Sequence, residues 1–154
     1  MSSFFGSINI AASGLSAQRV RMDTIAENIA NVNTTRTADG GPFQRRTVVF
    51  EQIPRQAPFH RTFGDALSGY QGEGVRVRHV LRDPSAGNLV YDPTHPDAFP
   101  PGHEMEGYVR MPNVNIVEEM VNMISASRSY EANITAMTSF RGIIQRTLEI
   151  GAGR

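Results

Sequence analysis

The sequence contains no cysteine and no lysine. Without cysteine the chain forms no disulfide, holds no thiolate-bound metal and has no cysteine nucleophile. Every basic residue is therefore arginine, whose planar guanidinium suits ion pairs at interfaces better than a lysine ammonium does. The formal net charge is +0 at pH 7, so the charge balance gives no reason to expect a nucleic-acid partner.

Long hydrophobic runs are also missing. No segment reaches the roughly 20 apolar residues that a membrane-spanning helix needs, so we expect no direct membrane span. The first 18 residues are uncharged, but Asn9 and Ser13 interrupt this stretch and no basic residue precedes it, which is unlike a cleaved signal peptide. If the protein leaves the cytosol, we expect it to do so without signal cleavage.

Apolar residues recur at every seventh position near both ends of the chain. This spacing places one apolar stripe along a helix, and such a stripe needs another helix against it. We therefore predict helices over residues 4–31 and from about 115 to 150. The predicted helix-packing or assembly residues are Ile8, Leu15, Met22, Ile25, Ile29, Ile116, Met120, Met123, Tyr130, Ile134, Met137, Ile144 and Leu148.

The two predicted helices differ in their local signals. The first is rich in serine and glycine, and its small residues Ala11, Ala12 and Gly14 would let a neighbouring helix approach closely. Each glycine costs a helix about 1 kcal/mol relative to alanine, so this helix should depend on packing. The second begins with Asn115 as N-cap and Glu118 three residues later, and we expect Gly151 with Gly153 to end it. Whether the packing partner is internal or another subunit stays open.

Short strands and turns fill the region between the helices. We predict strands over residues 43–53, 75–82, 88–91 and 108–111, and a loop over 54–74. In the strand over 75–82, Val75, Val77 and Leu81 alternate with three arginines, which predicts one buried face. The fold class is mainly α with a small β module, the N- and C-terminal helices pairing as a coiled-coil-like hairpin. We divide the chain into an N-terminal helix (1–33), a module of strands and loops (34–112) and a C-terminal helix (113–154). We expect the three parts to form one structural unit.

No group of residues predicts catalysis. The four histidines His60, His79, His95 and His103 lack the i, i+4 spacing of a helical metal pair. Asp92, His95 and Asp97 are better explained by turn chemistry than by metal binding. The Gly72–Gly74 pair precedes a strand rather than opening a helix, so it is a turn and no dinucleotide site. We expect no catalytic residue, metal, cofactor or small-molecule substrate.

Three further features have a structural and a functional interpretation. Glu118 and Glu119 complement the dipole of a helix N-terminus and need no catalytic role. The face formed by Arg76, Arg78 and Arg82 is either solvated or binds an acidic partner, and solvation is the commoner case. The methionines near the C-terminus could form a peptide groove, but their seven-residue spacing favours a helix–helix contact.

Two longer stretches resemble a known family. Residues 12–18 with Arg21 and 26–34 are similar to the N-terminal signature of bacterial flagellar axial proteins. Residues 107–115, 119–122 and 125–133 are similar to the C-terminal signature of their rod subset. Residues 42–50 also resemble the first strand of a proximal rod protein. The motif residues are Asn28, Asn31, Thr34, Pro112, Asn113, Glu119, Arg128, Glu131 and Asn133.

The resemblance implies a structural subunit of the flagellar basal-body proximal rod, not an enzyme. In this family the terminal helices pair and pack with those of neighbours in a helical polymer that transmits torque across the periplasm. The implied partners are copies of the chain, other rod proteins and, during secretion, the flagellar type III export apparatus. The competing interpretation is a cytosolic helical adaptor or type III export chaperone, and an enzyme ranks third.

Overall fold

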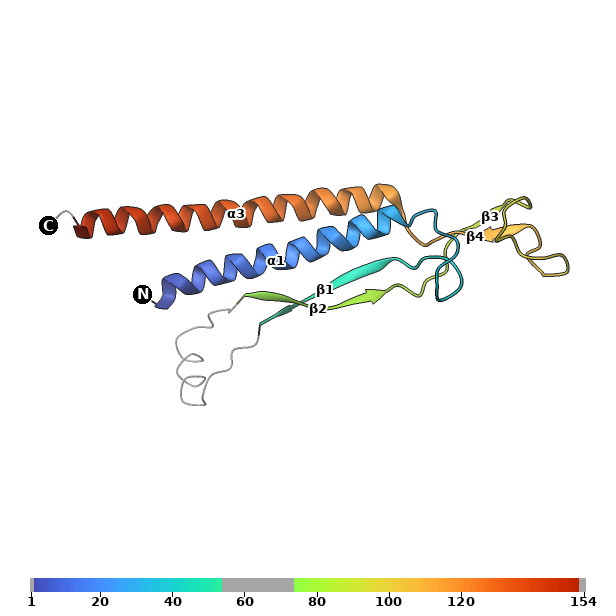
Figure 1. Ribbon diagram of the computed structural model, residues 1–154, viewed down its shortest axis with the longest axis horizontal. Helices are drawn as coiled ribbons and strands as arrows, with labels where there is room; N and C mark the ends of the chain where they lie inside the picture. The colour runs from blue at the N-terminus through green and yellow to red at the C-terminus, as the bar shows by residue number, and fades with distance from the viewer. Residues whose placement is uncertain (1, 54–73, 153–154) are drawn as a thin grey trace, which may run out of the picture. The chain divides into compact units, whose positions relative to one another are not determined.

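A computed structural model describes residues 2–53 and 74–152 (Figure 1). The predicted fold class is confirmed, because the chain has a long helix at each end and short strands and loops between them in the sequence. The predicted loop over 54–73, including Gly72 and His60, lies outside the described residues. In the described part of the chain, none of the helices is long and apolar enough to cross a membrane. The elements are α1 (Ser2–Ala30), β1 (Arg46–Gln52), β2 (Val75–Arg82), β3 (Leu89–Tyr91), β4 (Tyr108–Arg110) and α3 (Ile116–Ala152).

The chain divides into two compact units, each built from parts of both helices. The first unit comprises Met1–Val20, Val49–His79 and Ala126–Arg154. The second comprises Arg21–Val48 and Val80–Ser125. Each unit therefore contains a stretch of α1, a stretch of α3 and part of the connecting chain.

In the first unit, small residues of α1 lie against α3. Ala11, Gly14 and Ala17 are buried, three or four residues apart, on one face of the helix. A methyl group added to Gly14 would lie 3.0 Å from the side-chain amide atoms of Asn133 on α3. The absence of a side chain at Gly14 is thus what allows this close approach, as the small residues of the sequence predict.

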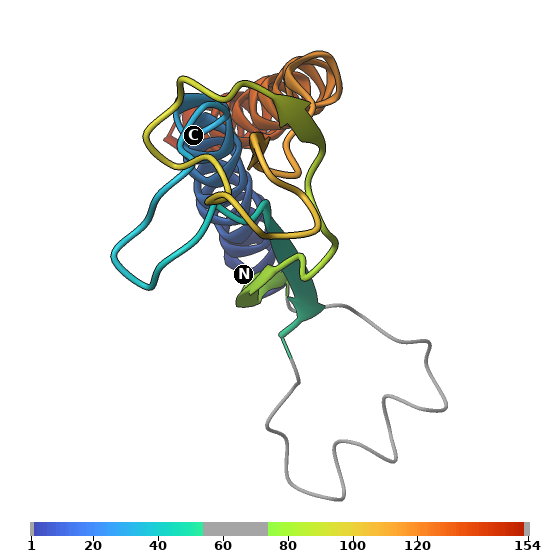
Figure 2. The ribbon, with the colours of Figure 1, turned by 90° about the vertical axis from the view of Figure 1, so that its right-hand side faces the viewer.

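In the second unit, the last turns of α1 lie beside the first turns of α3 (Figures 1 and 2). The buried residues of α1 here are Thr24, Ile25 and Asn28, and that of α3 is Glu119. Phe43 and Val109 add the buried apolar side chains of the connecting chain. The interior of this unit is therefore small and unusually polar.

The strands form two separate two-stranded sheets, β1–β2 and β3–β4. In the second sheet the strands are antiparallel, with Leu89 opposite Arg110 and Tyr91 opposite Tyr108. The predicted boundaries of β2 match the structure, but the predicted burial is only half correct. Val75 is partly buried, whereas Leu81 is 52% exposed, because a two-stranded sheet buries a face only where another element packs on it.

The start of α3 agrees with the sequence and its end does not. The Asn115 side-chain oxygen accepts hydrogen bonds from the backbone N–H groups of Val117 (3.0 Å) and Glu118 (3.5 Å), as an N-cap does. The helix continues through Gly151 to Ala152. The prediction is wrong for Gly151, because this glycine does not have the positive φ that a glycine C-cap adopts. The other predicted glycine, Gly153, lies outside the described residues.

Two glycines of α1 provide a matched test of the close helix contact. A Cβ at Gly6 would meet no atom within 4 Å, whereas a Cβ at Gly14 would crowd Asn133. We expect G6A to raise the free energy of unfolding by up to about 1 kcal/mol, through helix propensity. We expect G14A to be neutral or destabilising, and G14L to lower it by about 1–3 kcal/mol through overpacking. Urea denaturation followed by circular dichroism measures these changes; equal gains from G6A and G14A would contradict the contact.

Candidate functional site

A buried carboxylate is the most unusual feature of the second unit. Glu119, in the first turns of α3, is 1% exposed. Its Oε1 atom accepts hydrogen bonds from Arg45 Nε (2.8 Å) and pairs with Arg45 Nη2 (2.7 Å), and its Oε2 atom accepts one from Asn28 Nδ2 (2.9 Å). Both oxygens are therefore occupied by donors from other elements. A buried charge in this setting is tolerated because it is paired and hydrogen-bonded.

Arg45 is held in its charged form by the carboxylates around it. Burial of the guanidinium disfavours the charge, but the hydrogen bond and charge of Glu119, followed by the charges of Glu118 and Asp83, outweigh this and raise the pKa of Arg45. Glu118 Oε1 lies 3.2 Å from Arg45 Nη2. Glu118 therefore forms an ion pair with Arg45, in addition to any contribution to the helix dipole.

Asn28 connects α1 to the beginning of β1. Its side-chain oxygen accepts a hydrogen bond from the backbone N–H of Arg46 (2.9 Å), and its Nδ2 donates one to the backbone carbonyl of Arg46 (2.8 Å). The side-chain amide thus makes the same two bonds that a neighbouring strand would make to this residue. Because Nδ2 also donates to Glu119, Asn28 joins three elements.

Asn113 binds the backbone of Arg45, the residue just before β1, with its side-chain amide. Its side-chain oxygen accepts from the backbone N–H of Arg45 (2.7 Å), and its Nδ2 donates to the backbone carbonyl of Asp83 (3.1 Å) and to Ser85 Oγ (2.9 Å). Asn28, Arg45, Asn113 and Glu119 together form what we call the polar clasp. With both oxygens of its carboxylate hydrogen-bonded, the clasp is suited to fastening elements together and not to proton transfer.

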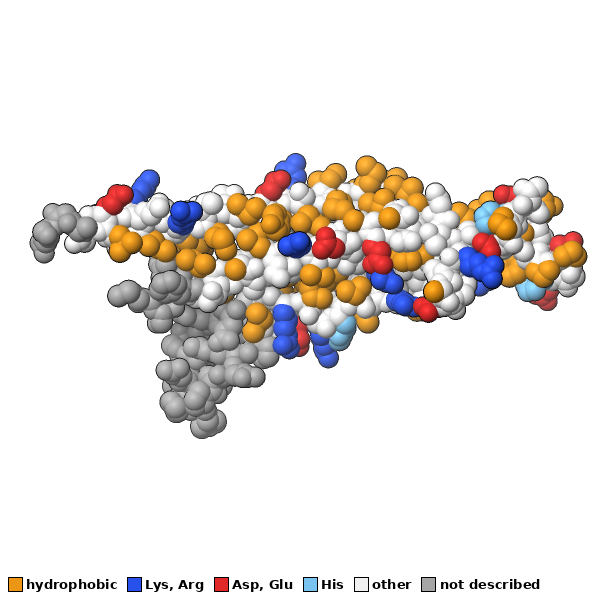
Figure 3. All heavy atoms as spheres, in the orientation of Figure 1, with side chains coloured by type: hydrophobic (Ala, Val, Ile, Leu, Met, Phe, Trp, Pro, Cys, Tyr) orange, Lys and Arg blue, Asp and Glu red, His pale blue; other side chains and the backbone are white. Residues whose placement is uncertain are grey.

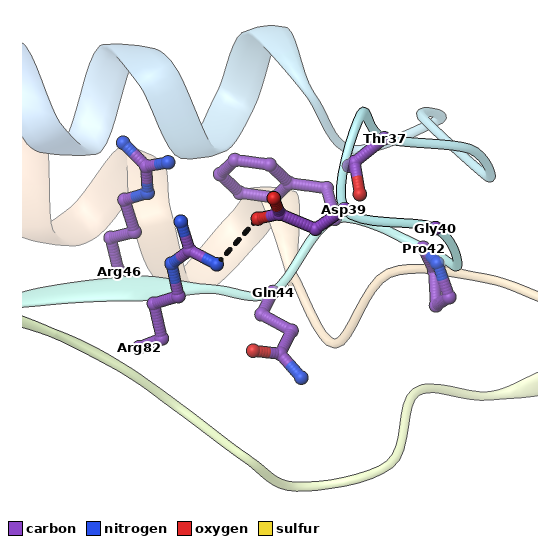
Figure 4. Close-up of a pocket in the computed structure, with 8 residues that line it drawn as sticks. Thr37, Asp39, Gly40, Pro42, Gln44, Arg46 and Arg82 are labelled. Atoms are coloured by element: carbon purple, nitrogen blue, oxygen red, sulfur yellow. Dashed lines mark hydrogen bonds and ion pairs between the residues drawn. The ribbon is translucent and has the colours of Figure 1, made fainter.

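A pocket is lined by Gln44 and Arg46, the two sequence neighbours of the clasp residue Arg45 (Figure 4). It has a volume of about 340 Å³ and includes two arginines, Arg46 and Arg82. Arg82 pairs with Asp39 at 2.9 Å and Arg46 with Glu27 at 2.6 Å, so the chain's own carboxylates already satisfy both charges. The remaining lining residues are Thr37, Gly40, Pro42 and Phe43.

The arginine face of β2 is partly neutralised in the same way. Arg76 pairs with Glu51 (3.1 Å) and Arg82 with Asp39, which leaves Arg78 exposed and without an ion pair to the rest of the described chain. The side chains of Asp92 and His95 serve local turns, whereas the Asp97 carboxylate accepts a hydrogen bond from Thr35 Oγ1 (2.7 Å) and lies 3.8 Å from Arg36 Nη1. The Asp92 carboxylate accepts from the Thr94 N–H and hydroxyl, and His95 Nδ1 accepts from the Asp97 N–H. Among residues 2–53 and 74–152, no group of three or more potential ligands is placed to hold a metal ion.

The outer surface of α3 in the second unit is apolar and uncovered. Five large side chains recur along its first three turns at helical spacing and are between 44% and 71% exposed. Figure 3 shows hydrophobic side chains gathered over this part of the helix. We call this the outer stripe; its members are Ile116, Val117, Met120, Val121 and Ile124.

Some of the predicted packing residues are buried or partly buried in the structure, and others are exposed. Ile25 is buried, and partial burial is found for Ile8, Leu15, Met22, Ile29, Met123, Tyr130, Met137 and Ile144. Four others are at least 40% exposed: Ile116, Met120, Ile134 and Leu148. The predicted stripe on α3 therefore combines residues that pack within the chain with residues that do not.

The predicted motif residues fall into three groups. Asn28, Asn113 and Glu119 belong to the clasp. Asn31 and Thr34 form the turn after α1, where Thr34 Oγ1 donates to Asn31 Oδ1 (3.1 Å). Pro112 is buried, Asn133 lies against Gly14, and Arg128 and Glu131 are exposed on α3.

Sequence reasoning missed Arg45 as a functional residue and explained Glu119 only by the helix dipole. One signal for the burial of Glu119 was its spacing. It lies seven residues before the fully buried Ala126, and residues seven apart lie on the same side of a helix. A carboxylate on the packed side of a helix must have a cationic partner. The sequence does not show which of its 15 basic residues provides it.

Comparisons with known proteins place this architecture in a family. A model described as "Flagella basal body rod protein" matches residues 8–36, and one described as "Flagellar basal body rod FlgEFG protein C-terminal" matches residues 105–150. The two matches cover most of α1 with its following turn, and β4 with most of α3. The chain belongs to the flagellar basal-body rod protein family.

Curated relatives match over almost the full length and carry one name, flagellar basal-body rod protein FlgC. The protein of Borreliella burgdorferi is 48% identical over 97% of this chain and 98% of its own. That of Bacillus subtilis is 43% identical over 96% and 97% of the two chains. That of Aquifex aeolicus is 40% identical over 97% and 98%. The clasp therefore lies in a chain that is similar to a rod protein from end to end.

The two adjacent glutamates of α3 allow a controlled test of the clasp. Glu119 is buried and Glu118 has a side chain that is 58% exposed, yet both pair with Arg45. We expect E119A to lower the free energy of unfolding by about 3–5 kcal/mol, because the partly buried Arg45 guanidinium loses its shorter ion pair and the buried Asn28 amide loses one of its two acceptors. E118Q should lower it by less than about 1 kcal/mol, as an exposed ion pair does. Urea denaturation measures both; similar losses would show that Glu119 is not the critical carboxylate.

Proposed function

We propose that this protein is a structural subunit of the flagellar basal-body rod, which polymerises helically through its terminal helices and transmits torque across the periplasm. The relatives named FlgC and the two rod family models support the rod assignment and do not favour the adaptor or chaperone alternative. The relatives bear the name of a structural protein, in agreement with a role without catalysis.

The observation that carries the assembly proposal is the outer stripe. Each large aliphatic side chain that moves from water into a contact contributes about 1.5–3 kcal/mol, so five of them are a strong driving force for association. Their spacing along one helix suits a partner that is itself a helix. A head-to-tail contact whose rotation does not close produces a filament, as a rod requires.

The partners in this proposal are copies of the chain and other rod proteins, with the basal body as the location. The finer part of the proposal concerns the route: the chain passes through the flagellar type III export apparatus without cleavage of a signal peptide. The uncharged first 18 residues and the glycines and serines of α1 support it. A helix of this composition has low intrinsic stability, so it can be unfolded for transport and refold on packing.

A charge placed on the outer stripe separates assembly from folding. Val121 is 62% exposed, so V121D should leave the stability of the purified chain within about 0.5 kcal/mol of wild type. In a polymer the same charge would be buried without a partner, so we expect rods to be absent and cells to be non-motile. The conservative variant V121A, which removes only part of the apolar side chain, should retain motility.

The measurement is electron microscopy of basal bodies purified from cells that carry each variant, with mass spectrometry to identify the chain. Secretion of V121D into the medium would show that export is intact and that assembly is the step that fails. L15D and M123D serve as contrasting variants, because these partly buried side chains pack within the chain and their loss should also lower the stability of the monomer. Normal rods containing V121D would sink the assembly role of the stripe.

A further inference from the structure

The β3–β4 sheet exposes aromatic residues that the assembly proposal does not use. Cross-strand partners share a face, so Tyr91 and Tyr108 lie together on one side, next to the pair of Leu89 and Arg110. Tyr91 is 65% exposed, and Leu89 and Tyr108 are 40% exposed. The two tyrosine rings are 5.2 Å apart at 66°. Figure 3 shows hydrophobic side chains with acidic ones among them over these strands. We call this side of the sheet the tyrosine face.

Two carboxylates stand at the same end of this sheet. Asp92 follows Tyr91, Glu106 comes just before Tyr108, and the backbone N–H of Asp92 donates to the carbonyl of Gly107 (3.0 Å). One oxygen of each carboxylate accepts from a nearby loop donor: Asp92 Oδ1 from Thr94, and Glu106 Oε2 from the Gly102 N–H (3.0 Å). Glu106 retains a second oxygen for a further donor, and the Asp92 carboxylate also interacts with the backbone N–H and the charge of His95. Within the described ranges 2–53 and 74–152, neither carboxylate forms an ion pair with an arginine.

The charge of Asp92 is secured by its own turn. The hydroxyl of Thr94 donates to the carboxylate at 2.7 Å and the backbone N–H of Thr94 at 3.1 Å, and these bonds lower the pKa of Asp92. The end of the sheet that carries the tyrosines is therefore negatively charged at neutral pH. Tyrosine rings beside carboxylates are a favourable environment for a guanidinium, which stacks on the rings and pairs with the oxygens.

This chain presents such a guanidinium on β2. Arg78 is exposed, and it lies in a strand that contains three arginines and no acidic residue. Its neighbours Arg76 and Arg82 have carboxylate partners at 3.1 Å and 2.9 Å, whereas Arg78 has none in the part of the chain that the structure describes. The guanidinium of Arg78 is thus exposed and unpaired in the described chain, which leaves it free to bind the tyrosine face.

We propose that the tyrosine face of one copy binds Arg78 on β2 of a second copy. The occupant is a second copy because its exposed arginine strand complements the acidic and aromatic end of the β3–β4 sheet in both charge and chemistry. The two surfaces differ, so the contact is heterologous and can repeat along a filament. This inference rests on the proposed rod function and adds a contact outside the terminal helices.

The absence of cysteine permits a direct test by disulfide cross-linking. Cells express two forms of the chain, one with Y91C and one with R78C, so that each copy carries one thiol. Basal bodies are then isolated and treated with a mild oxidant. We expect the mixed Y91C–R78C dimer in several-fold excess over either homodimer. Absence of the mixed dimer, or a link from Y91C to a different rod protein, overturns the proposal. A chain carrying both substitutions that cross-links within itself also overturns it.

A charge exchange tests whether the contact matters for assembly. R78E should reduce the number of rods per cell at least tenfold, and D92R/E106R should do the same, because each places like charges together. The combined variant R78E/D92R/E106R should recover a substantial part of the loss. R78K, which keeps the charge, should assemble better than R78E. If R78E rods form as in wild type, or the combined variant is no better than its parents, the contact is wrong.

These outcomes are distinguishable from failure of the proposed function. If the wild-type chain is absent from purified basal bodies, the rod assignment itself fails. If the wild-type chain is present and only the cross-link or the charge exchange fails, the rod assignment stands and the contact at Arg78 does not. Circular dichroism of each purified variant shows whether a loss of rods reflects misfolding; all the substituted side chains project from exposed or partly exposed positions.

Discussion

The second unit depends on one buried negative charge. Glu119 is held by Arg45 from the chain before β1 and by Asn28 from α1, and these residues in turn bind the backbone at the beginning of β1. Removing the carboxylate would take the shorter ion pair from a partly buried guanidinium and one of two acceptors from a buried amide. Since the apolar interior here is small, the hydrogen-bonded charges supply the specificity that a larger core would otherwise give.

Local patterns in the sequence predicted the helices, the Asn115 cap and the limits of β2, because each depends on neighbouring residues. The clasp could not be predicted in the same way: Glu119 and Arg45 are 74 residues apart, and any of the arginines could have been the partner. The seven-residue repeat also gave no information on which side of α3 packs internally. Met123 is partly buried and Met120 is 54% exposed, although both fit the apolar pattern.

Several carboxylates of this protein are taken up in ion pairs within the chain. The carboxylates of Glu119, Asp39 and Glu51 are each paired with an arginine of the same chain. Apolar side chains, by contrast, are left uncovered along α3, which is the reverse of what a monomeric globular protein does. In the proposed assembly, neighbouring subunits would cover these side chains, and the interior of a single chain could remain small.

The bonds that Asn28 makes to Arg46 have a consequence for solubility. A two-stranded sheet presents open backbone groups to any other extended chain, and such edges seed uncontrolled stacking into fibrils. By occupying both backbone groups of Arg46 with a side chain, α1 blocks the first position at which a foreign strand could pair with β1. For a subunit proposed to polymerise in one ordered manner, this side chain protects β1, at this position, against disordered aggregation.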